Sequence, residues 1–489
     1  MRQFMLPVVG LTIVLGGCAS LPHQPLQTAS DALAVAKLHT IEFSGTGRWF
    51  QFGQAPNPGL PWPQFELSRY TADVNYDNAS ARVQMTRKQT VEPKRLRPIP
   101  IEQKQDQYVS GNYAWNLAPP PNTSPTTEAV ATAQPLAVEE RIAEIWATPQ
   151  GFLKAAIAHQ ATSQALNEGA NVTFTVDGKY RYIGFINANH QVERIQTWID
   201  NPILGDTLVE TTFSDYQDFG GVPFPRHIER TQGGFPVLDL KVTEVKLNPP
   251  LALSVPTDIK NFKAPPVKST ELAKGVFYLT GGTHHSVAIE QHDHVVLVEA
   301  PLNEERSLAV IAKVKEIIPN KTIRYLLNTH AHFDHSGGLR TFVDAGATIV
   351  TQQQNQPYYE QSWSAERTIK PDRLASSNKP ANFKTFLDKH VLSDGKRTIE
   401  IHSIAGNGHN DAFALVYLPA EKILIEADAY TPTAANVPPP SSPNPYSINL
   451  YENIQKRGLD VDKIAALHGP GVVKLDDLRR VIGLSRALN

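Results

Sequence analysis

The chain has one cysteine, Cys18, among its 489 residues. A single thiol excludes the disulfide framework that holds many small exported domains together. It also excludes a cysteine nucleophile or a cysteine metal ligand from everything after residue 18. A chain of this length predicts two or more domains, whose cores must be stable through side-chain burial alone.

A strong charge of either sign is also missing. Lys and Arg number 46 and Asp and Glu number 48, which gives a formal net charge of −2. This balance predicts no nucleic-acid partner, because proteins that bind nucleic acids present a marked positive surface. After the first residues no stretch is long and apolar enough to span a bilayer. The composition is typical of a globular, exported protein.

The first residues predict export and a lipid anchor. Residues 5–14 are an apolar stretch of signal-peptide length, and Leu15-Gly16-Gly17-Cys18 resembles a bacterial lipobox. We expect cleavage of a signal peptide, residues 1–17, and lipidation of Cys18; the alternative is a plain signal peptide with a cysteine by chance. Ala19 follows the cysteine where Asp would favour the inner membrane, which predicts the outer membrane, facing the periplasm. Residues 18–33 then form a polar, flexible tether.

Residues 34–262 predict a mostly antiparallel β domain. Short alternating runs recur along this region, and Asp177-Gly178 between two of them is a hairpin signal. We expect one helical insert at 138–159 and an extended surface loop at 93–135. Residues 216–225 weakly resemble a turn of periplasmic lipoprotein-carrier proteins. Such a domain either binds a lipid or covers an active site, and we favour the covering role.

Six consecutive residues, His330-Ala331-His332-Phe333-Asp334-His335, carry the main functional signal. They follow an apolar run at 323–327, and three imidazoles with one carboxylate suit a divalent transition metal. Alternate positions of one strand-to-loop turn can face two adjacent metals. The alternative, a surface cluster of histidines, is disfavoured because the pattern is rare by chance.

Three further residues follow predicted strands in the same way. His409 follows a run at 398–404, Asp428 ends a run at 422–427, and His468 ends a run at 464–467. The carboxyl ends of strands are where α/β folds usually place their sites. A lone histidine is more often a core or capping residue, but the joint occurrence in this order predicts one site.

These residues resemble the metallo-β-lactamase superfamily over roughly residues 270–489. The resemblance implies an αββα sandwich at 268–489 and an α+β chain as a whole. It also implies two Zn²⁺ ions, the first held by His330, His332 and His409, the second by Asp334, His335 and His468, with Asp428 as the bridge. One departure is Glu299, where the family often has Asp in a supporting position. This puts the supporting geometry in doubt.

The resemblance implies a hydrolase that cleaves an ester, thioester, lactone or amide of a small molecule through a metal-bound hydroxide. Asp334 would be the catalytic residue, binding the second metal and orienting the hydroxide. Asp428 stands where one lactamase subclass has a cysteine ligand, so that subclass is excluded. Two alternatives stay open: a mononuclear iron oxygenase of sulfur substrates, and a lipoprotein that only binds a lipid or an envelope partner.

Other residues are candidate substrate contacts. His284 and His285 lie in a loop between two expected strands, and Tyr430 lies two residues after Asp428. The alternatives are two solvated histidines and an ordinary core tyrosine. We expect an irregular segment at 352–384 and a proline-rich loop at 430–446 near the mouth of the site. Because all seven ligands fall after residue 268, that part is expected to bind two metals without the first half.

Overall fold

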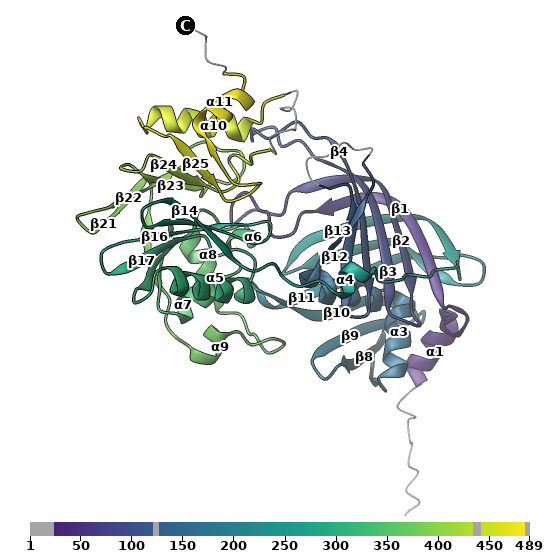
Figure 1. The fold of residues 1–489 in the computed structure, drawn as a ribbon. Coiled ribbons are helices and arrows are strands. Elements are labelled where there is room, and N and C mark those ends of the chain that lie inside the picture. Colours follow the sequence, from purple (N-terminus) through teal and green to yellow (C-terminus); the bar gives the residue numbers. More distant parts are fainter. Residues whose placement is uncertain (1–23, 121–126, 434–441, 485–489) are drawn as a thin grey trace, which may run out of the picture.

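The computed structural model describes residues 24–120, 127–433 and 442–484. The predictions on the signal peptide, on Cys18 and on residues 18–23 of the tether therefore lie outside the described residues. Two bodies of secondary structure lie side by side (Figure 1), with one 13-stranded sheet in the first and sheets of seven and six strands in the second. Among the described residues, no helix has the length and apolar character needed to cross a membrane.

The first body is one curved antiparallel sheet made of two meanders. β1 (Thr40–Phe50) pairs with β13 (Phe235–Leu247) in the middle of the sheet; β2 to β6 continue on one side and β12 to β7 on the other. Their bounds are β2 (Gln64–Asn75), β3 (Ser80–Gln89), β4 (Glu102–Ser110), β5 (Tyr113–Ala118), β6 (Val130–Ala133), β7 (Thr162–Leu166), β8 (Gly169–Val176), β9 (Tyr180–Asn187), β10 (Val192–Asn201), β11 (Gly205–Asp218) and β12 (Pro223–Gln232). This confirms the predicted β-rich fold of the N-terminal region.

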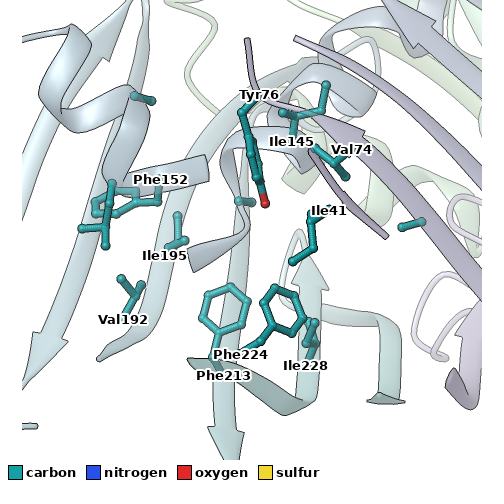
Figure 2. Packing of buried hydrophobic residues seen from close by; sticks show 14 of the residues in the cluster. Ile41, Val74, Tyr76, Ile145, Phe152, Val192, Ile195, Phe213, Phe224 and Ile228 are labelled. Carbon is teal, nitrogen blue, oxygen red and sulfur yellow. The ribbon is translucent and has the colours of Figure 1, made fainter. Parts of the chain in front are cut away.

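Helices fill the inside of this sheet. α2 (Val138–Trp146) contacts β3, β4, β5 and β10, strands of both meanders, and α3 (Pro149–Ala158) contacts β8. Figure 2 shows Ile145 of α2 and Phe152 of α3 among the buried side chains of the strands. Gly184 makes room for Phe152, because a Cβ there would lie 2.2 Å from the ring. The core of the first body is therefore closed by its own helices.

Two expectations for the helices need correction. The tether ends earlier than predicted, because residues from Gln24 form α1 (Gln24–Ala32), with Leu26, Ala29 and Leu33 in the core. These residues recur at helical spacing, which a reading based on polarity overlooked. The single helix expected at 138–159 is two helices, because Thr148 is extended and caps α3, its hydroxyl accepting from the Gly151 amide.

The loop expected at 93–135 contains β4, β5 and β6, and that expectation was wrong. β4 is mostly polar and half exposed along its length, so it lacks the alternation of apolar residues that marks a strand with one buried face. Its pairing with β3 over nine residue pairs fixes it in the sheet. A short helix, α4 (Thr257–Lys260), then lies in the proline-rich stretch before the second body.

The second body is the expected αββα sandwich. One sheet has the order β14-β15-β16-β17-β18-β19-β20 and the other β21-β22-β23-β24-β25-β26. On β17, Val296 and Val298 belong to the core between the sheets, whereas Val295 and Leu297 pack under α5 and α7. α10 and α11 cover the other side (Figure 1). The strands are β14 (Lys268–Ala273), β15 (Val276–Thr280), β16 (Ser286–Glu290), β17 (His294–Val298), β18 (Thr322–Leu327), β19 (Thr348–Gln352), β20 (Asn382–Phe386), β21 (Lys389–Ser393), β22 (Thr398–Ser403), β23 (Ala414–Leu418), β24 (Ile423–Glu426), β25 (Lys463–Ala466) and β26 (Val472–Lys474).

The helices of the second body are α5 (Glu304–Ile317), α6 (Phe333–Ser336), α7 (Leu339–Asp344), α8 (Asn355–Trp363), α9 (Arg373–Ser377), α10 (Pro445–Lys456) and α11 (Leu475–Val481). The segment 352–384, expected to be irregular, therefore holds two helices and β20. Tyr359 of α8 is fully buried, and its hydroxyl donates to the Asn328 side chain at 2.5 Å. This contact anchors the helix beside the end of β18, where the histidine motif begins.

Candidate metal centre

The histidine motif lies where β18 turns into the short helix α6. The two glycines after it allow a close approach to the loop before α5. A Cβ at Gly337 would lie 1.9 Å from the Leu302 carbonyl, and one at Gly338 would lie 1.9 Å from the Ser307 hydroxyl. The motif is therefore fixed on a buried turn, where side chains keep a defined direction.

The structure brings all seven predicted ligands together at one edge of the sandwich. Asp428, just after β24, lies between the others: its Oδ2 is 2.9 Å from His335 Nε2 and 3.1 Å from His330 Nε2, and its Oδ1 is 2.8 Å from His468 Nε2. Two groups of possible donors, each within 4.8 Å, are His330, His332, His409 and Asp428, and His284, Asp334, His335 and His468. The carboxylate predicted as the bridge thus contacts members of both groups.

His284 is a member of the second group that sequence reasoning placed only among substrate contacts. Its Nε2 lies 3.1 Å from Asp334 Oδ2, and a backbone bridge joins it to His468. Its neighbour His285 points elsewhere, with Nε2 3.0 Å from the Gly469 carbonyl oxygen and a buried ring. The loop before β16 therefore brings one histidine to the site and uses the other to hold the segment after β25.

Glu299 supports the centre although it is longer than the Asp often found in the family. One oxygen lies 2.9 Å from His335 Nδ1, and the other accepts the Thr329 amide at 2.5 Å. The residue is fully buried and has a left-handed backbone, with φ +69°. Such a conformation is costly for a glutamate, so the surrounding hydrogen bonds must hold it. The extra methylene does not prevent the supporting contact.

One buried nitrogen shows that the residues fit a metal. His332 Nε2 lies 3.0 Å from the Ala55 carbonyl oxygen, while Nδ1 is buried without a hydrogen-bond partner among the described residues. An unsatisfied buried nitrogen is costly, and a metal-binding histidine commonly donates its other ring nitrogen to a carbonyl. A donor set of imidazoles and carboxylates, without thiolates, suits zinc.

The electrostatics hold four of the donors in forms that bind metals, whereas Asp428 and Asp334 outweigh burial and raise the pKa of His335 well above its usual value. Burial lowers the pKa of His330 to about 4 and that of His332 well below its usual value, which keeps both imidazoles neutral. Burial would raise the pKa of Asp428, but His335 and His409 outweigh it and hold that pKa well below its usual range. His335 and the hydrogen bond from His284 likewise overcome burial and lower the pKa of Asp334.

Tyr430 has a different environment. It is buried in the core of the sandwich, and its amide donates to Glu426 Oε2 at 2.9 Å. Burial, and then the charge of Asp477 on α11, raises its pKa to about 12. This placement favours an ordinary core tyrosine over the predicted substrate contact. Residues 434–441 of the expected loop at the mouth lie outside the described part of the chain.

Comparison with known proteins agrees with this geometry. Residues 279–468 match the metallo-beta-lactamase superfamily. The similar solved structures include a metallo-beta-lactamase from Pontibacter korlensis, 17% identical over 45% of this chain and 98% of that one, with a TM-score of 0.34. FIM-1 from Pseudomonas aeruginosa in its mono-zinc form is 19% identical over 45% and 96% of the two chains, with a TM-score of 0.34. Rubredoxin oxygen:oxidoreductase from Desulfovibrio gigas is 15% identical over 44% and 61%, with a TM-score of 0.36.

Comparison with curated proteins gives no match. The family match spans every residue of both donor groups, from His284 to His468. Together with these clusters of His and Asp, it supports a metal-dependent hydrolase. Residues 279–468 of this chain are therefore similar to the metallo-beta-lactamase superfamily.

Proposed function

We propose that the protein is a dinuclear zinc hydrolase that cleaves an ester, thioester, lactone or amide of a small molecule. The observation that carries the proposal is the pair of adjacent four-donor groups with Asp428 between them. His330, His332 and His409 would hold the first ion, Asp334, His335 and His468 the second, and Asp428 would serve both. Bound zinc supplies a water of lowered pKa and polarises a carbonyl group.

The side chains of the centre have distinct roles in this proposal. The side chain of Asp334 is the most exposed of the seven predicted ligands, at 31%, against 16% for Asp428. Its low pKa makes it an anionic acceptor that can orient a water through a hydrogen bond at the side where substrate enters. The buried Glu299 holds His335 in one orientation. Asp334 is therefore the catalytic residue of the proposal.

A cavity of about 310 Å³ beside Asp334 is the proposed substrate pocket. Both bodies form its walls: Phe52, Leu136 and Ile203 come from the first and Phe333 from the second. The volume lies at the lower end of the range for small-molecule pockets, roughly 300–1,000 Å³. The apolar walls fit an aryl or branched alkyl group next to the carbonyl that is cleaved.

The charges around this cavity favour neutral or cationic substrates. Four carboxyl groups, on Glu139, Glu140, Asp200 and Asp334, line it, against one ammonium group, on Lys370. Burial raises the pKa of Asp200 to about 6 and that of Glu140 to about 7, so at neutral pH Asp200 is mostly ionised and Glu140 about half ionised. An anionic substrate would still meet like charge in a partly buried space. We therefore propose that carboxylate-bearing substrates such as β-lactams are poorer substrates than neutral aryl esters or lactones.

The two alternatives have less support. An iron oxygenase with two His and one Asp needs fewer donors than either group provides. A lipid-binding role would need a large cavity inside the first sheet, whereas two spaces found there among the described residues measure about 30 and 70 Å³. We also propose that the protein is lipid-anchored through Cys18 at the outer membrane. Cys18→Ser is expected to release the protein from the membrane fraction without the mass of a lipid, and unchanged recovery in that fraction would refute the anchor.

The full-length protein, loaded with zinc, iron or manganese in turn, would be tested against aryl esters, lactones, thioesters and β-lactams. We expect two zinc ions per chain by elemental analysis and turnover of neutral aryl esters or lactones above that of β-lactams. One iron per chain with oxygen consumption would replace the proposal with the oxygenase. Two zinc ions without hydrolysis of any of these classes would exclude the proposed reaction.

A further inference from the structure

The segment between β1 and β2, residues 51–57, reaches from the first body into the metal centre of the second. The Gly53 carbonyl accepts the amide of Phe333, inside the histidine motif, at 3.1 Å. The Pro56 carbonyl accepts the amide of Asp411, two residues after the predicted ligand His409, at 2.8 Å. The segment therefore joins two separate ligand-bearing loops through backbone hydrogen bonds.

Gln54, between these two contacts, binds the predicted catalytic carboxylate directly. Its Nε2 donates to Asp334 Oδ1 at 2.8 Å, and the other oxygen, Oδ2, lies 3.1 Å from His284 Nε2. A carboxylate with hydrogen bonds to both oxygens has a fixed plane, and its remaining lone pairs point in defined directions. Gln54 is the partner that the first body contributes.

The next residue, Ala55, acts on the first group of donors. Its carbonyl oxygen lies 3.0 Å from His332 Nε2, and it also accepts from Asn410 Nδ2 at 3.3 Å. A carbonyl oxygen accepts only, so the proton of His332 must lie on Nε2. The unpartnered Nδ1 is then the lone-pair nitrogen directed at the metal. The tautomer of a predicted ligand is therefore set by the backbone of the first body.

The position of the segment is fixed by close contacts. Gly53 has φ +79°, and a Cβ there would lie 2.7 Å from the ring of Phe333. That ring packs edge-on against Phe52 and Trp62, with centroids 5.3 and 5.7 Å away. The Phe333 ring is partly buried there and packs against the hydrophobic cluster of Phe50, Ala55, Trp62 and Val237. Phe333, the one phenylalanine of the motif, thus fixes the position of residues 51–57 relative to the ligands.

We propose that Gln54 and the Ala55 carbonyl are positioning groups of the metal centre, so that the centre is complete only when both bodies are present. Gln54 orients Asp334 for the second metal, and the Ala55 carbonyl orients His332 for the first. This inference rests on the proposed dinuclear hydrolase. It adds a residue about 280 positions before the motif, outside the region that matches the family.

The test compares Gln54→Leu with Gln51→Leu in the full-length protein. Leu keeps most of the volume of Gln but removes the amide, and Gln51 lies in the same segment, its carbonyl accepting from the Gln54 amide. The affinities of both zinc sites would be measured by competition with a chelator, together with kcat and KM for an aryl ester. Loss of such a supporting contact typically weakens metal binding or activity by about 10–100-fold.

For Gln54→Leu we expect the second zinc to bind about 10–100-fold more weakly and kcat to fall by a similar factor. The first zinc and KM should stay within about twofold, and Gln51→Leu should resemble the wild type. If Gln54→Leu does not fold by circular dichroism, Gln54→Asn, which keeps the amide but is one methylene too short, should show the same selective loss of the second zinc.

Wild-type affinity for the second zinc in a folded Gln54 variant would overturn the inference, as would an equal loss in Gln51→Leu. These outcomes differ from failure of the proposed function itself. If the wild-type protein binds fewer than two zinc ions or hydrolyses no substrate, the dinuclear assignment fails before any variant is compared. If the wild type behaves as proposed and the variant does not change, only the positioning role of Gln54 is wrong.

Discussion

The two bodies of the molecule bury polar groups to different ends. In the first, buried cations find partners on α2 or on the sheet: Arg230 pairs with Glu144 of α2, and the Arg87 guanidinium lies 3.9 Å from the ring centroid of Trp49. Burial lowers the pKa of Arg87 to about 10, but the group stays charged at neutral pH. In the second body, imidazoles and carboxylates crowd together, and one nitrogen of His332 has no hydrogen-bond partner in the described part of the chain.

This difference separates a scaffold from a site. In the first body, Arg230 and Glu144 neutralise each other inside the core that α2 and α3 close. The donors of the second body are six histidines and two carboxylates close together, and a bound cation would satisfy them, because buried polar groups need partners and neighbouring like charges repel. Four predictions test how far the two roles are really separate, from the largest expected effect to the smallest.

Removing a donor should destroy the site and leave the scaffold intact. For Asp334→Ala we expect a folded protein, loss of the second zinc and a fall in turnover of more than about a hundredfold, above the range for supporting residues. Elemental analysis and steady-state kinetics measure both effects. Asp293→Ala, which removes a half-exposed carboxylate paired with Arg324, is the control. Equal zinc content and turnover in Asp334→Ala and wild type would contradict the ligand assignment.

Separating the two bodies should weaken the site without removing its donors. Residues 268–489 alone carry all predicted ligands but lack Gln54 and the Ala55 carbonyl. We expect this fragment to bind zinc at least about tenfold more weakly than the full chain and to lose most of its turnover. Titration with a chelator gives the affinity. Full affinity and turnover of the fragment would show that the first body only covers the site. The sequence alone predicts that this fragment binds both metals without the first half.

A substitution in the part of the cavity wall that the first body forms should change substrate binding and leave metal binding unchanged. Leu136 lines the cavity and is 55% exposed, so Leu136→Asp should be tolerated by the fold. Losing part of one leucine contact costs about 1 kcal/mol, which corresponds to a rise in KM of about fivefold for an aryl ester, with zinc content unchanged. Leu166→Asp, on a strand at the far edge of the sheet, is the matched control. Equal KM values for the two variants would remove Leu136 from the pocket.

The smallest expected effect is on the pH dependence of the free energy of unfolding, through a carboxyl group of the first body. Burial, and then the charge of Glu144, raises the pKa of Glu140 from 4.5 to about 7. Between these two values the folded state binds more protons than the unfolded state, so the free energy of unfolding falls as pH rises through that window. We expect the melting temperature to fall from pH 5 to pH 7.5, and to fall less in Glu140→Gln. The exposed Glu193→Gln should behave like the wild type; an identical slope in all three would contradict the assignment.

The metal donors could be predicted from the sequence because each follows an apolar run that predicts a strand. His409, Asp428 and His468 follow such runs, and the order of strands brings their ends to one edge. The supporting groups could not be predicted in the same way. Gln54 lies in a loop without periodicity. Every residue has a backbone carbonyl, so the role of the Ala55 carbonyl cannot be predicted from the sequence. Only the chain path, which places this loop over the motif, determines their role.

The fold of the first body shows a related limit. Strands with one buried face, such as β11, alternate strictly and are visible in the sequence. β4 is polar on both faces and was missed, since its place depends on pairing with β3 rather than on burial. α1 was missed for the opposite reason, because three buried residues at helical spacing are hidden in a polar segment. Local composition therefore predicts burial well and predicts pairing poorly.

The pairing of β1 with β13 has a consequence for the order in which the protein is made. Ile41 pairs with Leu247, so the sheet cannot close until both have left the ribosome. At about 5–20 residues per second, this takes on the order of tens of seconds. The histidine motif is synthesised later still. The segment that bears Gln54 is therefore synthesised before every ligand that it contacts.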